Sequence, residues 1–322
     1  MKHLILILSV LLFSCGNAQN GKTGQNAQQD IVDAPIFNPD SAYLYVKKQV
    51  DFGARVPNTD AHKACAAYLS NELRRFGAEV TEQHATLKAY DSTILNSVNI
   101  IGAFNPEKTI RILLAAHWDS RPFADNDHDV NNYNKPVLGA NDGASGVGVL
   151  LEIARLMNEK LPEVGVDIIF FDSEDYGQPY FYRQAEVPNS WCLGSQYWAK
   201  NPHIPNYHAR YGILLDMVGA AGASFKKDKI SMIYAPHVVI KVWTKAQSLG
   251  YASLFRDEEG GYITDDHVYI NELAGIPCID IIDFDDGFFE HWHTVNDDMK
   301  NIDKNTLKAV GQTLLVVIYN EK

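Results

Sequence analysis

Five short apolar runs are the feature of this sequence that most constrains its fold. They are SVNIIGAF, RILLAAH, VDIIFFD, YGILLDM and IPCIDIID, which begin at Ser97, Arg111, Val166, Tyr211 and Ile276. Runs this short and this continuously apolar are typical of strands buried on both faces of a sheet. The sequence therefore predicts a sheet whose two faces are both covered.

Segments with apolar residues at helical spacing fill the intervals between these runs. They span residues 60–76, 146–159, 237–250 and 305–320. Asp60 is expected to cap the first of them, which ends at Gly77. Alternation of this kind predicts a doubly wound α/β fold, with a mostly parallel, mixed central sheet flanked by helices.

The N-terminus has the features of a targeting segment. In MKHLILILSVLLFSCGN, a basic start is followed by about ten apolar residues and then Cys15. This apolar run is too short to span a bilayer as a helix. We expect residues 1–14 to be a lipoprotein signal peptide, with Cys15 lipidated after cleavage. An ordinary secretory signal, in which Cys15 is incidental, is the alternative. The expected location is the periplasm or cell envelope of a bacterium, with membrane contact only through the lipid anchor.

The rest of the chain is expected to be one domain. Residues 16–34 are rich in Gly, Asn and Gln without an apolar period, so we assign 15–35 to a flexible tether. Residues 36–322 contain no internal repeat and no second linker, and 46% of the whole chain is hydrophobic. A single catalytic α/β domain of this size is within the usual range.

Charge and cysteine content narrow the function. The 28 Lys and Arg residues against 40 Asp and Glu residues give a net charge of −12, with no basic run, which argues against a nucleic-acid partner. Beyond Cys15, only Cys65, Cys192 and Cys278 remain, so at most one disulfide is possible and no thiolate metal motif is present. Cys65 and Cys278 lie in apolar runs and are expected to be buried.

Acidic and imidazole side chains follow several of the predicted strands. They are His117 after RILLAA, Asp172, Glu174 and Asp175 in VDIIFFDSEDYGQ, Asp216 after YGILL, and Asp142 in the Gly-rich loop LGANDGASG. In open α/β sheets the carboxyl ends of the strands form the ligand-binding crevice. Asp142 alone would be an ordinary helix cap, and His293 in EHWHTVND an ordinary surface histidine. Their joint occurrence instead predicts one shared cleft.

Imidazole and carboxylate groups together are the ligands of a catalytic zinc site. Such a site also needs a carboxylate that does not bind the metal and can carry protons. Neighbouring residues Glu174 and Asp175 can divide these two tasks, because side chains diverge in an irregular turn.

These residues belong to six motifs whose order resembles a known family. The motifs are HWD (117–119), GANDGASGVGVLLEIAR (139–155), FFDSEDYG (170–177), LLDMVGA (214–220), TDDHVYI (264–270) and HWHTVND (291–297). Together they resemble the M28 zinc peptidase superfamily, and more narrowly its glutaminyl-peptide cyclotransferase branch, the animal-type glutaminyl cyclases found also in bacteria. The resemblance covers roughly residues 40–320 and implies a zinc-exopeptidase-like fold.

The resemblance implies specific roles for residues of this chain. Asp142, Asp175 and His293 match the ligands of one Zn²⁺ per chain, although animal members carry Glu at the position of Asp175. Glu174 matches the proton-shuttling acid. The remaining implied positions are Asp216 and Asp265 as carboxylates around the reacting centre, and Trp292, Ile263 and Trp191 as the substrate pocket. Asp280 stands where animal members have His, so the surrounding hydrogen-bond network is expected to differ.

The implied reaction converts the N-terminal glutamine of peptides or proteins to pyroglutamate with release of ammonia. We expect a monomer whose loops 120–138 and 176–190 form lids or rims over the cleft. A two-zinc M28 aminopeptidase is the main alternative, because His117 and Asp216, with Asp142 bridging, could bind a second metal. A non-catalytic peptide-binding surface lipoprotein is a further alternative.

Overall fold

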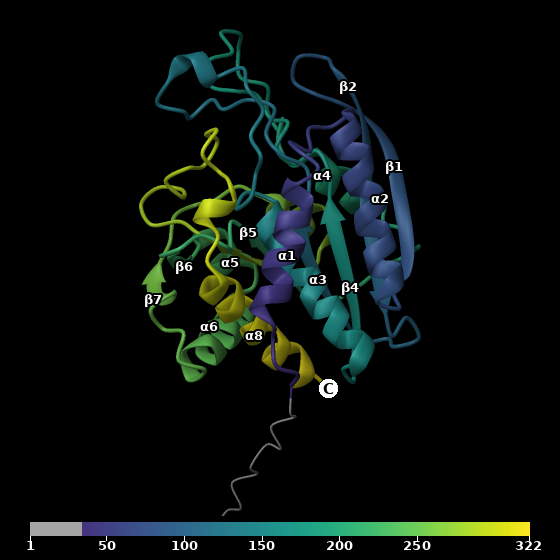
Figure 1. The fold of residues 1–322 in the computed structure, drawn as a ribbon. Coiled ribbons are helices and arrows are strands. Elements are labelled where there is room, and N and C mark those ends of the chain that lie inside the picture. The colour runs from purple at the N-terminus through teal and green to yellow at the C-terminus, as the bar shows by residue number, and fades with distance from the viewer. Residues whose placement is uncertain (1–33) are drawn as a thin grey trace, which may run out of the picture. The chain divides into compact units, whose positions relative to one another are not determined.

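A six-stranded mixed sheet forms the centre of the structure, a computed structural model that describes residues 34–322. Its strand order is β1-β2-β4-β3-β5-β8 (Figure 1). The strands are β1 (Glu79–Lys88), β2 (Ile94–Phe104), β3 (Arg111–His117), β4 (Gly165–Phe171), β5 (Tyr211–Asp216) and β8 (Cys278–Ile282). Strands β4, β3, β5 and β8 are parallel, whereas β2 is antiparallel to β1 and to β4. The predicted fold class is therefore confirmed.

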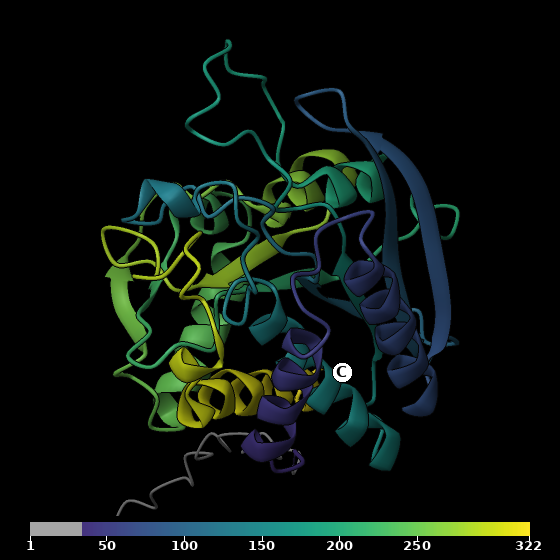
Figure 2. The ribbon, with the colours of Figure 1, turned by 45° about the horizontal axis from the view of Figure 1, so that its top comes forward.

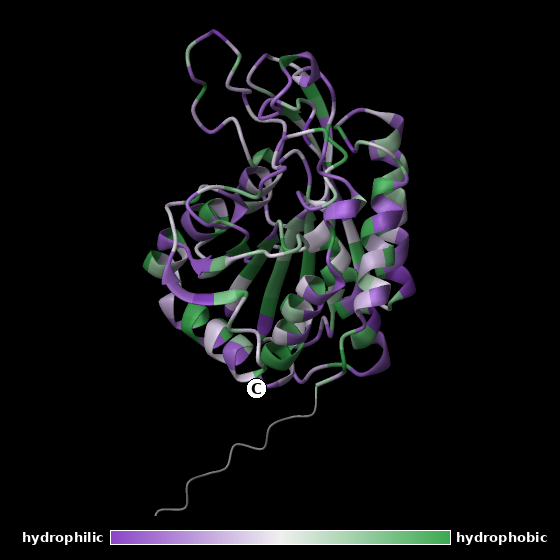
Figure 3. Cartoon of the chain, turned by 60° about the vertical axis from the view of Figure 1, so that its left-hand side comes forward, coloured by the Kyte–Doolittle hydropathy of each residue, from purple (hydrophilic) through white to green (hydrophobic). Residues whose placement is uncertain are grey.

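Helices cover both faces of this sheet (Figure 2). One face carries α1 (Pro39–Val50), α2 (Asp60–Arg75), α3 (Ala144–Glu159), α6 (Pro236–Ser248) and α8 (Lys304–Tyr319), and the other carries α4 (Leu193–Lys200) and α7 (Asp266–Ala274). Leu113 and Leu114, adjacent on β3, belong to the two different cores. Apolar side chains therefore face both ways along the strands, which are coloured hydrophobic in Figure 3.

The five predicted strands and four predicted helices are all present, but several elements were missed. Helices α1, α4 and α7, the short α5 (Lys229–Tyr234), edge strand β1 and the separate pair β6 (Phe225–Lys227) and β7 (Phe255–Glu259) were not predicted. Strand β1 is half-exposed and reads EVTEQHATLK, so it contains no apolar run. The expected cap at Asp60 is wrong. The N-cap of α2 is Thr59, whose side chain accepts the N–H of His62 at 3.2 Å.

Strand register brings the site residues to one edge of the sheet. His117 lies opposite Phe171 of β4, and Asp216 lies opposite Ile282 of β8. Strand β4 lies on one side of β3 in the sheet, and β5, the next strand in the chain, lies on the other side of β3. The strand order therefore reverses at β3. This switch point is where open α/β sheets bind ligands.

The two long loops lie beyond this edge of the sheet, past the arrowhead of β4 in Figure 1. Tyr133 of loop 120–138 stacks on Phe181 of loop 176–190, with ring centroids 5.8 Å apart. Phe123 meets the same Phe181 edge-on at 5.7 Å. The loops therefore support each other as one aromatic rim.

The predicted N-terminal segments and the cysteines can be placed only in part. Signal peptide 1–14 and all but the last two residues of the tether 15–35 lie outside the described residues. Within residues 34–322, no helix has the length and hydropathy of a bilayer span. Cys65, Cys192 and Cys278 are all buried and unbridged.

Asp172 ties the end of β4 to two other elements. Its buried carboxylate accepts the N–H of Val98 at 2.6 Å and that of Ser173 at 2.7 Å. His62 of α2 donates from Nε2 to both carboxylate oxygens at 2.9 Å. Because Ser173 is left-handed, with φ 57°, these bonds hold a turn that few non-glycine residues adopt. These contacts give Asp172 a structural role at the end of β4.

Replacing Asp172 by Ala is expected to lower the free energy of unfolding by about 2–5 kcal/mol. Two buried donors, on His62 and Val98, would lose their acceptor, and each costs about 1–3 kcal/mol. Urea denaturation measures the change, with Glu163→Ala at an exposed site as a control that should shift stability by no more than about 0.5 kcal/mol. A loss below about 1 kcal/mol in Asp172→Ala would contradict this role.

Candidate active site

Asp142, Asp175 and His293 converge from three separate segments. Asp142 precedes α3, Asp175 follows β4, and His293 lies in the long connection between β8 and α8. His293 Nε2 is 3.1 Å from Asp175 Oδ1 and 3.6 Å from Asp142 Oδ2. All three side chains are buried, and one ligand atom from each lies within 4.8 Å of the others. Asp142 is not the helix cap, since the N-cap of α3 is Gly143.

The geometry and charge of this triad fit a zinc ion. Donor atoms around a tetrahedral zinc lie about 3.3 Å apart, which is close to the observed spacing. Apart from ion-pair contacts with His293 and Arg121, neither carboxylate oxygen of Asp175 has a hydrogen-bond partner among the described residues, although the side chain is 1% exposed. Burial and the neighbouring Asp142 raise the pKa of Asp175 to about 6. A cation held here would bind the Asp175 carboxylate and offset its repulsion from Asp142.

His293 is oriented for metal binding by Asp125. Its Nδ1 lies 3.3 Å from Asp125 Oδ1, which leaves Nε2 facing the two carboxylates. Arg121 donates to both oxygens of Asp125, at 3.0 and 2.7 Å. Burial opposes ionisation of Asp125, but His293 and Arg121 outweigh it and hold its pKa below the usual value. Sequence reasoning missed Asp125, because it lies in loop 120–138 away from any strand end.

Two further acids, also missed, fix the backbone of the site residues. Asp119 accepts the N–H groups of Glu174 and Asp175, at 3.1 and 3.2 Å. Asp297 accepts the N–H of Asp142 at 3.0 Å. Both residues are buried. They lie in the motifs HWD and HWHTVND, so those motifs could have indicated that they belong to the site.

Glu174 forms a separate group with Asp265 and Cys192. The three offer donor atoms within 4.8 Å of one another, and Cys192 Sγ donates to Glu174 Oε1 at 3.2 Å. Burial, followed by repulsion from Asp175 and Asp265, raises the pKa of Glu174 well above 4.5 despite the opposing effect of His117. A carboxyl in this environment holds a proton more tightly than an exposed one.

Asp216 and Asp265 are two buried acids that line the same cavity. Burial raises the pKa of Asp216 to about 7, with a smaller contribution from Asp142. Asp265 is the N-cap of α7 and accepts the N–H of Asp266 at 2.5 Å. Burial also raises its pKa. Both carboxyls are therefore harder to ionise than exposed aspartates.

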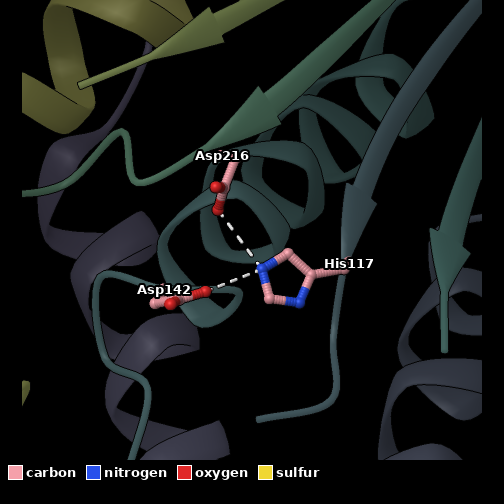
Figure 4. A group of neighbouring side chains, drawn as sticks. All are labelled: His117, Asp142 and Asp216. Atoms are coloured by element: carbon pink, nitrogen blue, oxygen red, sulfur yellow. Dashed lines mark hydrogen bonds and ion pairs between the residues drawn. The ribbon is translucent and has the colours of Figure 1, made fainter. Parts of the chain in front are cut away.

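His117 lies behind the cavity and is engaged by two carboxylates (Figure 4). Its Nε2 is 2.9 Å from Asp142 Oδ1 and 3.2 Å from Asp216 Oδ1. Burial lowers the pKa of His117, but Asp119, Asp142 and Asp216 outweigh it and raise the pKa well above 6.5. Nε2 therefore faces both carboxylates, and ligand atoms of His117, Asp142 and Asp216 also lie within 4.8 Å of one another.

Asp280, which stands where animal members of the family carry His, is buried. Its Oδ2 lies 3.8 Å from Nδ1 of His267, whose Nε2 is 3.6 Å from Asp228. Burial and repulsion from Asp265 raise the pKa of Asp280 well above its usual value. The acid at this position therefore lies beside an imidazole that also contacts a second acid, Asp228.

A cavity of about 300 Å³ opens onto these groups. The predicted site residues that line it are Asp142, Glu174, Asp175, Trp191, Asp216, Ile263, Asp265, Trp292 and His293, whereas His117 is not among its lining residues. Met217, Thr264, Ile282 and Phe288 complete the walls and were not predicted. The structure thus brings together every predicted catalytic, zinc-binding and pocket residue.

The tryptophans form stacked walls around the imidazole. Trp292 stacks on His293 with ring centroids 3.7 Å apart, and Trp191 lies parallel to His293 at 5.7 Å. The Arg121 guanidinium covers Trp191 at 4.3 Å. A Cβ at Gly177 would collide with the Trp191 ring, so this glycine permits the close approach. The resemblance assigned Trp191 to the substrate pocket, and the structure puts it on the cavity wall.

Comparisons with known proteins show which family this chain is similar to. The model of peptidase family M28 matches residues 99–318. The structure of Bacteroides thetaiotaomicron glutaminyl cyclase bound to N-acetylhistamine is 59% identical, with a TM-score of 0.89, covering 90% of this chain and 100% of that one. A Zn-dependent exopeptidase from Parabacteroides distasonis is 57% identical, with the same TM-score and coverage.

A similarity at lower identity extends to animals. The glutaminyl-peptide cyclotransferase of Bos taurus is 24% identical over 364 residues, which cover 98% of this chain and 95% of the bovine protein. The match with the family model spans more than half of the chain. The chain therefore belongs to peptidase family M28, and within that family its sequence and fold are similar to those of glutaminyl cyclases.

Proposed function

We propose that this chain is a zinc-dependent glutaminyl-peptide cyclotransferase, which converts the N-terminal glutamine of peptides and proteins to pyroglutamate. One observation carries the proposal: a single cavity places the Asp142–Asp175–His293 triad beside a separate carboxylate, Glu174. The similarity to the bacterial glutaminyl cyclase and to the bovine cyclotransferase supports it.

Zinc is the cofactor of this enzyme, and we infer one ion per chain, held by Asp142, Asp175 and His293. When bound there, zinc supplies Lewis acidity that polarises the side-chain amide carbonyl of the substrate glutamine. Asp125 contributes by keeping the Nε2 of His293 directed at the triad.

The cavity selects a short aliphatic side chain with a polar end. Trp292 and Ile263 present apolar surface to the methylene groups of glutamine, and the amide end faces the triad. At about 300 Å³, the cavity is at the small end of the range of ligand pockets. It therefore encloses one residue, while the rest of the peptide stays outside.

Glu174 moves the proton that the reaction must transfer. As the α-amine attacks the amide carbon, Glu174 accepts a proton from that amine and passes it to the departing amide nitrogen. The carbon–nitrogen bond of the amide breaks, and ammonia leaves. Asp216 and Asp265 lie close enough to hydrogen-bond around this centre. Because ring closure is intramolecular, the site mainly has to hold one conformer of the glutamine.

Two alternatives can be weighed against the cyclotransferase. A two-zinc aminopeptidase would bind a second ion between His117, Asp142 and Asp216, whose ligand atoms also lie within 4.8 Å of one another, so the preference for the cyclotransferase rests on the similarity to glutaminyl cyclases. A binding protein without activity would not need the triad together with Glu174 in one cavity. We therefore retain the cyclotransferase as the function.

We further propose that the enzyme is a monomeric lipoprotein of the cell envelope. The basic start, the apolar run and Cys15 in the sequence support lipid attachment. Cys15→Ser should abolish incorporation of radiolabelled palmitate into the full chain expressed in a bacterial host. Equal labelling of Cys15→Ser and the wild type would refute the anchor.

Glu174→Gln should lower kcat/KM for a Gln-initiated peptide by about 100- to 10,000-fold while zinc content stays at the wild-type level. The amide keeps the size of the side chain but cannot accept the proton. His293→Ala should instead reduce bound zinc, and Glu163→Gln, at an exposed site, serves as the matched control. Ammonia release and metal analysis give the two readouts. Retained turnover in Glu174→Gln would show that another group carries the proton.

A further inference from the structure

A groove of about 550 Å³ adjoins the catalytic cavity. The two hollows share Trp191 and Thr264 in their walls. Its outer wall is the loop 178–190, and its inner wall includes Tyr269 at the start of α7. Nothing in the chemistry of cyclisation needs this groove, so its presence requires a separate explanation.

A peptide held by its first residue must leave the cavity through one of its openings. The groove beside Trp191 is one exit, and a hollow of about 360 Å³ that shares only Phe288 with the cavity is another. That second hollow is lined by several acids, including Asp283, Asp285 and Glu290. The groove is larger and shares more wall with the cavity, so it is the better path for the following residues.

The loop that forms the groove is held in shape by its own hydrogen bonds. The Gln178 side chain accepts the N–H of Val187 at 2.8 Å and donates to the carbonyl of Ala185 at 3.5 Å. Tyr269 donates its hydroxyl to Asn189 Oδ1 at 3.4 Å, which joins the loop to α7. A wall that is already ordered binds a peptide with a smaller entropy cost.

The lining of the groove suits a peptide backbone and one basic side chain. Amide and aromatic side chains predominate, namely Gln178, Gln184, Asn189, Tyr180 and Tyr182. Among the described residues that line the groove, Glu186 is the one that carries charge. Its side chain is exposed, and within residues 34–322 no hydrogen bond or ion pair engages its carboxylate.

We propose that this groove binds the two or three residues that follow the N-terminal glutamine, and that Glu186 favours a basic side chain among them. The inference rests on the proposed cyclotransferase activity, which supplies the direction of the peptide. An exposed ion pair of this kind changes binding by about two- to fivefold and weakens at high salt.

A peptide series tests the proposal with the full chain. Gln-Ala-amide is compared with Gln-Ala-Ala-Ala-amide, and then Lys or Glu replaces each Ala of the longer peptide in turn. We expect a higher kcat/KM for ammonia release from the longer peptide. At one of these positions, the Lys peptide should exceed the Glu peptide by about two- to fivefold. This ratio should fall towards one in Glu186→Gln.

Glu290→Gln is the matched control, because Glu290 is an exposed acid of the other hollow. The Lys-to-Glu ratio should stay at the wild-type value in this variant. A ratio near one in the wild type, a ratio unchanged in Glu186→Gln, or a ratio that falls in Glu290→Gln instead would each overturn the groove assignment. Failure of every Gln peptide to release ammonia would instead refute the cyclotransferase itself.

Discussion

Repulsion between buried carboxylates is the constraint on which this site depends. Asp142, Glu174, Asp175, Asp216 and Asp265 line one cavity of about 300 Å³. The fold offsets that repulsion in different ways at different positions. His117 and His293 hold the pKa of Asp142 below its usual value in spite of burial, whereas the pKa values of Asp175 and Asp216 are raised to about 6 and 7. The zinc ion proposed for the triad would offset the repulsion between Asp142 and Asp175.

The turn after β4 allows the adjacent acids Glu174 and Asp175 to take different roles. Ser173 in a left-handed conformation is followed by two acids whose N–H groups both donate to Asp119. With their backbone fixed in this way, Glu174 and Asp175 direct their carboxylates to different neighbours, Cys192 and His293. Adjacent residues of similar chemistry therefore occupy separate positions, one fit for proton transfer and the other for metal binding.

The parts of the structure that the sequence predicts are those with a local signal. Buried strands such as β3 and β4 are continuous apolar runs, and acids at their ends are visible without any structure. Edge strand β1 gives no such signal, because half-exposed residues alternate along it. Asp125 was also missed, because its role depends on a loop that brings it to His293 from 168 residues away in the chain, a contact that no local pattern encodes.

Mass analysis of paired peptides distinguishes cyclisation of an N-terminal glutamine from aminopeptidase cleavage. Two peptides that differ only in beginning with Gln or Leu are incubated with the full chain, with and without a zinc chelator. We expect loss of ammonia from the Gln peptide alone, and we expect the chelator to abolish this loss. Release of free Leu from the second peptide would contradict it and indicate an aminopeptidase.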